Sequence, residues 1–317
     1  MVNGVSKLAT AWFGDGERGL ATALGSLTTP IGCIVGLVMG PIFVADFKDG
    51  GDVSRAQQEI SHYMMISGGI TTCMCLPLLI FFEERPEKFP SKSAKFSSSQ
   101  KFNFMSDLKL LATNRNYILI CLNFAMLYGV YTCLGAIINN VTSPFGYTST
   151  DSSIFGGVFI FCGLSGSFTV SSYLDKSPKY LRTLRMICFG TLIASTIFLF
   201  VLPKANLLLT VLNIAILGII LLPIIPLCYS FSIELTFPVS EAMSNGVMMM
   251  FSQIVGSITT VLGTKLASYH PESEYTIIMF LGMMSVSCFT SLFIKEDLRR
   301  INMSRNTISE KVGAQAT

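Results

Sequence analysis

Charged residues are scarce in this chain. Asp, Glu, Lys and Arg together make up only 13% of its 317 residues, whereas 51% are hydrophobic and the mean hydropathy is +0.59. Because a soluble domain carries roughly 25% charged residues, this composition excludes an ordinary soluble protein and predicts an integral membrane protein. The net charge of +3 is small, and we expect no nucleic-acid partner.

Histidine is also rare, and the nine cysteines show no repeated metal-binding spacing. The chain has two histidines, and every cysteine lies within an apolar stretch. A structural metal site needs several Cys, His or carboxylate ligands, whereas cysteines in apolar segments usually act as small core residues. The sequence therefore predicts no metal, no cofactor and no disulfide framework, and we do not expect an enzyme.

Long apolar runs account for most of the chain. A helix needs about 20 apolar residues to cross a hydrocarbon core of ~30 Å, and eight runs approach that length. They lie at 19–45, 61–82, 116–140, 153–174, 183–203, 206–231, 244–267 and 275–294. Four prolines inside these runs predict kinks: Pro41, Pro77, Pro223 and Pro226. Three pairs of glycines predict close helix contacts: Gly68 and Gly69, Gly156 and Gly157, and Gly163 and Gly166.

The 22 Lys and Arg residues divide unevenly between the two sides of such a protein. If eight spans alternate, 18 of these residues fall on the side that holds both termini and only four on the other. Because basic loops favour the cytoplasmic side, we expect both termini in the cytoplasm. The pattern leaves open whether the membrane is the plasma membrane or that of an organelle.

The same runs divide the chain into four parts. Residues 1–82 hold two spans, 83–115 form a Ser-, Lys- and Pro-rich cytoplasmic linker, 116–294 form a six-helix bundle, and 295–317 form a cytoplasmic tail. Within the linker, the stretch FNFMSDLKLLATN has apolar residues at helical spacing. We expect this stretch to lie as a helix along the membrane surface.

The opening stretch AWFGDGERGLATALGS has a weak counterpart at residues 236–256, TFPVSEAMSNGVMMMFSQIVG. At a constant offset of 224 residues, Glu17 corresponds to Glu241 and Gly32 to Gly256. Repeats of this kind build the two six-helix halves of one large transporter class. The later segment enters the fifth helix after the linker, so the opening stretch predicts a fifth helix of a first half. We expect helices one to four of that half to be missing from this chain.

Five segments carry a family resemblance: ATAWFGDGER, FFEERPEKFPS, YLDKSPKYLRT, SIELTFPVSEAMSNGVMMMFSQIVGS and IKEDLRRIN. They resemble the feline leukaemia virus subgroup C receptor (FLVCR) family of the major facilitator superfamily, over nearly the whole chain. The resemblance implies an all-α integral membrane protein of about eight transmembrane helices, corresponding to helices five to twelve of a major facilitator fold. It also implies a transporter of choline, ethanolamine or heme.

The resemblance assigns roles to a few residues. Gln253 matches a glutamine that lines the family's choline cavity, and Tyr131 matches the first of two adjacent aromatic residues, with Thr132 in the second place. The loop from Asp175 to Arg182 is similar to the superfamily's cytoplasmic Gly-x-x-x-Asp gating motif, with serine in place of the glycine. The tryptophan of the family's aromatic cage belongs to the helices that we expect to be missing, which weakens choline as the specific substrate.

Ionisable residues are almost absent from the middle of the helices. Asp175, Glu234 and Glu241 lie at predicted helix ends, so no acid at mid-depth is available to relay protons. A neutral cavity lined by rings and amides suits a quaternary ammonium, which cation–π attraction can hold. The polar residues at mid-depth are all neutral: Asn123, Tyr128, Tyr131, Asn139, Asn140, Asn213, Tyr229 and Gln253.

From this set we predict five solute-contacting residues: Tyr131, Gln253, Asn139, Tyr128 and Asn213. The alternative for each is a hydrogen bond between helices, which is the common role of such residues in membranes. Four residues are predicted to act at the cytoplasmic gate: Asp175, Arg182, Glu17 and Glu241. For the two glutamates, the alternative is helix capping or pairing with basic residues, because carboxylates are stabilised near helix N-termini.

We therefore expect a transporter that moves a small organic solute by alternating access without proton coupling, surrounded by membrane lipid. The alternative is a truncated membrane protein that does not transport, either a regulatory partner or an incomplete gene product. The expected partners of such a chain are the missing N-terminal helices or a full-length homologue.

Overall fold

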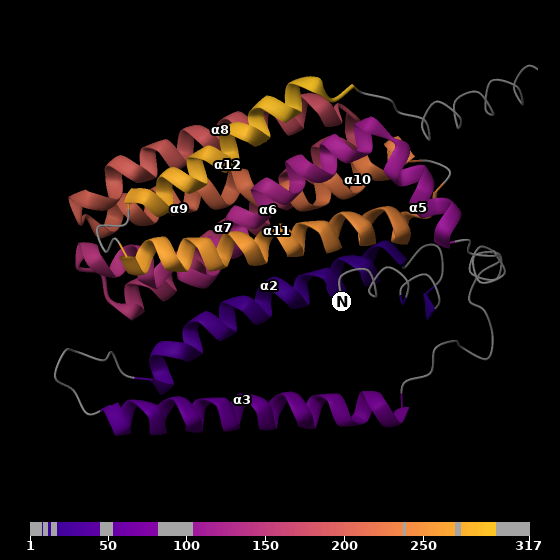
Figure 1. Cartoon of the computed structure of the whole chain (residues 1–317). Helices are drawn as coiled ribbons and strands as arrows, with labels where there is room; N and C mark the ends of the chain where they lie inside the picture. Colours follow the sequence, from indigo (N-terminus) through magenta and orange to yellow (C-terminus); the bar gives the residue numbers. More distant parts are fainter. Residues whose placement is uncertain are drawn as a thin grey trace, which may run out of the picture. The chain divides into compact units, whose positions relative to one another are not determined.

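The computed structural model describes residues 8, 12–13, 18–44, 53–81, 104–236, 239–269 and 274–295. Most of this part of the chain is α-helical (Figure 1). The α-helices are α2 (Arg18–Phe43), α3 (Val53–Phe81), α5 (Phe104–Thr113), α6 (Arg115–Thr142), α7 (Ser149–Lys176), α8 (Tyr180–Val201), α9 (Leu207–Leu221), α10 (Ile224–Thr236), α11 (Glu241–Tyr269) and α12 (Glu274–Phe293).

Seven helical spans within the described residues are long and apolar enough to cross a membrane. One of them, Leu207–Thr236, runs through both α9 and α10. The remaining predicted run corresponds to α2, in which the apolar stretch Thr28–Phe43 is shorter. All eight predicted runs therefore fall on helices, and the expectation of an all-α, multi-pass integral membrane protein is confirmed.

The chain groups into two compact units. One contains α2, α3 and residues 148–157, which include the first turns of α7, and the other contains α5, α6, the rest of α7, and α8 to α12. In the first unit, Leu37 lies so close to Gly156 that an added Cβ atom would be 2.7 Å from Leu37 Cδ1. Residues 148–157 thus belong, by their contacts, to the same unit as α2 and α3, which precede the predicted linker. The helix predicted within that linker is α5.

The predicted kink at Pro223 is confirmed as a break between α9 and α10. The last helical bond of α9 runs from the Leu222 N–H to the Gly218 carbonyl at 3.1 Å. Pro223 cannot add the next bond, because proline has no N–H group to donate. Pro226 lies in the first turn of α10, where N–H groups have no partner within the helix. The other two prolines lie inside helices that continue without a break: Pro41 and Pro77.

In the second unit, α6 packs against α10, α11 and α12, and sixteen of its 28 residues are buried. Small residues make its contact with α11 close. A Cβ atom added to Gly256 would lie 2.7 Å from the Thr132 hydroxyl oxygen. One added to Gly263 would lie 2.7 Å from Cys133 Sγ. Close approach through small residues is typical of helices that associate in membranes.

Glycines also bring α7 and α9 together. A Cβ atom added to Gly166 would collide with the backbone carbonyl of Ile219. One added to Gly218 would collide with the backbone carbonyl of Phe159, and Gly163 faces the side chain of Leu222, directly after α9. The predicted close contact at Gly163 and Gly166 is therefore confirmed, and its partner is the end of α9 that precedes the break. At Gly68, Gly69 and Gly157 an added Cβ atom would have no described atom within 4 Å, so the close contact predicted there is not found.

The Gly166 contact predicts a large difference between two glycines of the same helix. We expect Gly166→Ala to destabilise the protein by about 1–3 kcal/mol, because the added methyl group overpacks a contact made by backbone. Gly157 has no neighbouring atom within 4 Å of an added Cβ, so Gly157→Ala is the matched control. Thermal unfolding in detergent should show a lower midpoint for Gly166→Ala only. Equal midpoints for the two variants would contradict the close contact.

Candidate functional site

Two predicted solute residues on α6 meet a third on α11. Tyr128 and Tyr131 are three residues apart, which places them on one face of α6, and their ring centroids lie 5.6 Å apart. Gln253 Nε2, on α11, lies 3.5 Å from the Tyr128 hydroxyl oxygen and donates to it. The close packing of α6 on α11 positions these groups. The structure thus brings Tyr128, Tyr131 and Gln253 together.

Further aromatic side chains surround these two tyrosines. The Phe124 ring stacks on Tyr128 at a centroid distance of 5.3 Å and lies 5.9 Å from the Tyr229 ring of α10. The Phe159 ring of α7 stacks on Tyr131 at 6.0 Å. We call these five residues the aromatic cluster: Phe124, Tyr128, Tyr131, Phe159 and Tyr229. Three helices contribute to the cluster, and Gln253 adds an amide from a fourth.

Sequence reasoning did not find Phe124 or Phe159, because neither has a polar group that marks it as a candidate. Phe124 lies four residues before Tyr128, so helical spacing could have placed the two rings on one face. Phe159 belongs to another helix, and no spacing in the sequence relates it to Tyr131. Only the packing of the helices reveals its place in the cluster.

The Tyr229 hydroxyl group has an unusual environment. Its oxygen is buried and has no hydrogen-bond partner in the described part of the structure. Burying a hydroxyl group without a hydrogen bond costs roughly 1–3 kcal/mol by protein mutational data. This hydroxyl is therefore an unpaired polar group inside the bundle, which a polar group of a solute can reach only after the surrounding side chains move. The sequence placed Tyr229 at mid-depth but did not separate it from the other neutral residues there.

The two predicted asparagines lie apart from the aromatic cluster in different ways. Asn139 is exposed in the last turn of α6, eight residues and about 12 Å along the helix beyond Tyr131. Asn213 is buried on α9, and its Nδ2 donates to the Ala194 carbonyl of α8 at 3.3 Å. Asn213 thus links two helices, which is the alternative role considered for each polar residue.

Asn123 connects three helices and is fully buried. Its Nδ2 lies 2.7 Å from the Ser287 carbonyl oxygen and 3.4 Å from Thr290 Oγ1, both on α12. The same amide nitrogen is 3.6 Å from Cys188 Sγ on α8. These contacts satisfy the buried amide within the protein, so we assign Asn123 a structural role.

Hydrogen bonds tie α6, α10 and α11 together where α6 begins. The Tyr117 hydroxyl group donates to the Ser244 carbonyl of α11 at 2.6 Å. The Asn114 Nδ2 group donates to the Leu235 carbonyl of α10 at 2.9 Å. The sequence did not indicate these bonds, because a tyrosine or asparagine near a helix end gives no sign of its distant partner.

The predicted gating residues are described only in part. Glu17 lies outside the described residues, and so does the side chain of Asp175, near the end of α7. Arg182 is exposed near the start of α8, and Glu241 is exposed as the first residue of α11. That place suits a carboxylate, since the helix dipole stabilises negative charge at an N-terminus. A gating role for the four residues stays a prediction.

The aromatic cluster and Gln253 contain no carboxylate, no histidine and no basic group. Among the described residues, no group of three or more His, Cys, Asp or Glu side chains could hold a metal ion. The cluster instead offers ring faces, three phenol hydroxyl groups and one amide. Such a set can attract a small organic cation by cation–π interaction and bond its polar substituents, without forming a fixed ion pair.

The family model of the Major Facilitator Superfamily matches residues 1–260. The chain is 25% identical over 311 residues to the rat choline/ethanolamine transporter FLVCR2, and the match covers 97% of this chain and 56% of that protein. It is 24% identical to human FLVCR2, with 97% and 58% covered, and 25% identical to feline FLVCR1, with 94% and 54% covered. The chain thus spans little more than half the length of these curated relatives.

Two solved structures have a similar fold. The first is a bacterial homologue of the human lysosomal transporter Spinster, with a TM-score of 0.59 and 12% identity over 91% of this chain and 71% of that one. The second is a single-residue variant of the E. coli fucose:proton symporter FucP, with a TM-score of 0.57 and 16% identity over 92% and 73%. At such low identity, these matches bear on the fold alone.

The buried contacts of Asn123 give a stability test. We expect Asn123→Ala to destabilise the protein by about 1–3 kcal/mol, because it removes the donor to Ser287 and leaves buried polar atoms unpaired. Asn140→Ala, at an exposed position on the same helix, is the control and should have little effect. Thermal unfolding of both purified variants measures the difference. If Asn123→Ala unfolds at the wild-type midpoint, Asn123 has no structural role.

Proposed function

This chain belongs to the Major Facilitator Superfamily, and we propose that it takes part in the transmembrane transport of a small organic cation such as choline or ethanolamine. The relatives in this superfamily are transporters rather than enzymes. The observation that carries the proposal is the aromatic cluster together with the Gln253 amide, which contacts the Tyr128 hydroxyl group. The names of the FLVCR relatives agree with a cation of this class.

Ring spacing supports the binding of an ammonium group. A cation is attracted to an aromatic face when it lies within about 6 Å of the ring centroid. The Tyr128 and Tyr131 centroids are 5.6 Å apart, and those of Tyr131 and Phe159 are 6.0 Å apart. One ammonium group placed beside Tyr131 can therefore reach a second ring of the cluster. Tyr131 is the residue shared by both pairs.

Two polar groups of the site are available for the hydroxyl group of the solute. The Gln253–Tyr128 contact, at 3.5 Å, is longer than the 2.7–3.2 Å of a good N–H···O bond, so little is lost when Gln253 turns to a solute. The buried Tyr229 hydroxyl has no partner among the described residues. Among the axial ligands of heme iron, the cluster has no His, Cys or Met side chain and offers only tyrosine, so heme fits this site less well than a small cation.

The proposed transport is facilitated diffusion or exchange by alternating access, without proton coupling. Intramembrane carboxylates and histidines mark the proton relays of pumps and transporters, and neither is present in the aromatic cluster. In this superfamily the substrate site lies between two helix bundles near the bilayer midplane. The second unit, which holds the cluster, supplies one side of such a site. We propose that helices outside this chain, from the same protein or from a full-length homologue, supply the other side.

A second function follows from the exposure of α3. None of the residues in its most apolar stretch is buried, and the chain spans 56% of rat FLVCR2. An apolar helix whose surface its own unit leaves uncovered suits association with other membrane helices. In this second proposal, the chain does not transport but regulates a full-length relative by binding to it.

Choline uptake by cells that express the chain tests the first proposal. We expect Tyr131→Ala to lower uptake about 2- to 30-fold, the range of a cation–π contribution of about 0.5–2 kcal/mol. Tyr131→Phe should retain most of the uptake, since the ring face remains, and Gln253→Ala should lower it. The control is Tyr173→Ala, an exposed position on α7.

Unchanged uptake in both alanine variants would refute the proposed site. If the chain gives no uptake but co-purifies with a full-length relative and alters its uptake, the regulatory function is supported instead.

The absence of proton coupling gives a separate expectation. Uptake of labelled choline should be the same with and without a protonophore at constant membrane potential, because no acid in the cluster needs to change its protonation during transport. Proteoliposomes with an imposed pH gradient and clamped potential allow the measurement. A several-fold rise in uptake on acidifying the outside would contradict the proposed mechanism.

A further inference from the structure

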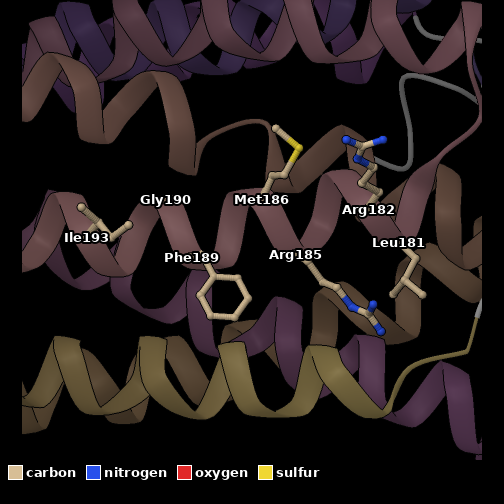
Figure 2. A pocket seen from close by; sticks show the side chains of 7 residues that line it. All are labelled: Leu181, Arg182, Arg185, Met186, Phe189, Gly190 and Ile193. Atoms are coloured by element: carbon tan, nitrogen blue, oxygen red, sulfur yellow. The ribbon is translucent and has the colours of Figure 1, made fainter.

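A hollow of about 610 Å³ lies on the surface of α8, away from the aromatic cluster. Seven residues of this helix line it: Leu181, Arg182, Arg185, Met186, Phe189, Gly190 and Ile193 (Figure 2). Their spacing places them along one side of the helix. Two arginines lie at one end of the hollow, the other lining residues are apolar, and none is acidic. The hollow is therefore basic at one end and apolar along the rest.

The basic end is held in place by α12. Arg185 Nε donates to the Ser291 carbonyl at 3.3 Å, and its Nη2 donates to the Leu292 carbonyl at 3.4 Å. A guanidinium group has five N–H donors, so Arg185 retains donors beyond these two bonds. Arg182 precedes it by three residues, one helical turn, and is exposed. The two side chains leave α8 on different sides of its axis in the view of Figure 2, and both line the hollow.

At the apolar end, Gly190 lets α9 approach α8, because an added Cβ atom would be 3.0 Å from Ile220 Cγ2. Phe189 and Ile193 are 46% and 61% exposed, so they present apolar surface outward. A chain of methylene groups could lie over Gly190 between these side chains.

The length of the hollow matches one leaflet of a bilayer. Arg182 and Ile193 are eleven residues apart, which corresponds to about 16 Å along a helix. Half of a ~30 Å hydrocarbon core is about 15 Å. Because Arg182 lies near the start of α8, the basic end falls at headgroup level when α8 spans the membrane, and Ile193 falls near the midplane.

We propose that this hollow binds one anionic phospholipid from the leaflet at the α8 N-terminus. Its phosphate lies between Arg182 and Arg185, and one acyl chain runs past Phe189 and Gly190 to Ile193. The charge of the arginines selects an anionic headgroup, and the apolar wall selects a lipid over free phosphate. This site shares no residue with the aromatic cluster, although Arg182 is also one of the four predicted gating residues.

Lipid binding by the full chain tests this proposal. The protein is reconstituted into nanodiscs of equal parts phosphatidylcholine and phosphatidylglycerol, extracted gently, and its bound lipids are counted by native mass spectrometry. We expect phosphatidylglycerol to be enriched over phosphatidylcholine in the bound fraction. Each basic residue near a membrane surface contributes about 1 kcal/mol of attraction to anionic lipid. Arg182→Gln should therefore reduce the enrichment about fivefold, and Arg182→Gln/Arg185→Gln about 25-fold.

Two controls separate this site from diffuse attraction and from a phosphate site. Arg115→Gln/Lys176→Gln removes two charges from the ends of α6 and α7 at the same side of the bundle, and should lower the enrichment much less than Arg182→Gln/Arg185→Gln, because those two residues do not line the hollow. Glycerophosphate, which has a similar anionic headgroup but no acyl chain, should not displace the bound lipid. An equal loss in the control variant, displacement by glycerophosphate, or full enrichment in Arg182→Gln would each overturn the proposal. Arg185 also bonds to α12, so the double variant could alter the fold there. The single variant Arg182→Gln leaves those bonds in place and tests the site by itself.

Discussion

The close approach of α6 and α11 is the contact on which the arrangement of the second unit depends. Lipid tails are as apolar as the side chains that face them, so helices in a membrane associate through packing and hydrogen bonds rather than a hydrophobic force. Gly256 removes the side chain that would hold α11 away from Thr132. With α6 and α11 packed this closely, Gln253 lies opposite Tyr128, and the Tyr117 hydroxyl group at the start of α6 reaches the Ser244 carbonyl of α11. One packing surface thus positions polar groups at two depths of the bundle.

The neutral polar residues of the bundle divide into those satisfied by the protein and those that are not. Asn123 bonds to the Ser287 carbonyl of α12, and the Asn213 amide nitrogen bonds to a carbonyl of α8. Both side chains therefore contribute to helix association. The Tyr229 hydroxyl group is buried without such a partner among the described residues, and Gln253 makes only a long bond. Two further buried oxygens also have no partner among the described residues, Asn213 Oδ1 and Thr276 Oγ1, so unpaired polar atoms are not confined to the aromatic cluster.

Much of the fold could be predicted from the sequence, because the bilayer requires helices of about 20 apolar residues. The break at Pro223 was also predictable, since proline cannot donate the helical bond. The site was predicted in part. Tyr128 and Tyr131 share a helical face, and Gln253 came from a family resemblance. The role of Asn213 was not predictable, because it depends on a carbonyl of another helix, and nothing in the sequence paired Phe159 with Tyr131.

The break between α9 and α10 has a mechanical consequence. α9 is fixed to α7 where Gly218 meets the Phe159 backbone, whereas α10 continues from Pro223 as a separate rigid rod that carries Tyr229 six residues further on. The far end of α10 is bound to the start of α6, where Asn114 Nδ2 donates to the Leu235 carbonyl. The break at one end and this bond at the other thus fix the direction of α10, and with it the place of the Tyr229 ring beside Phe124.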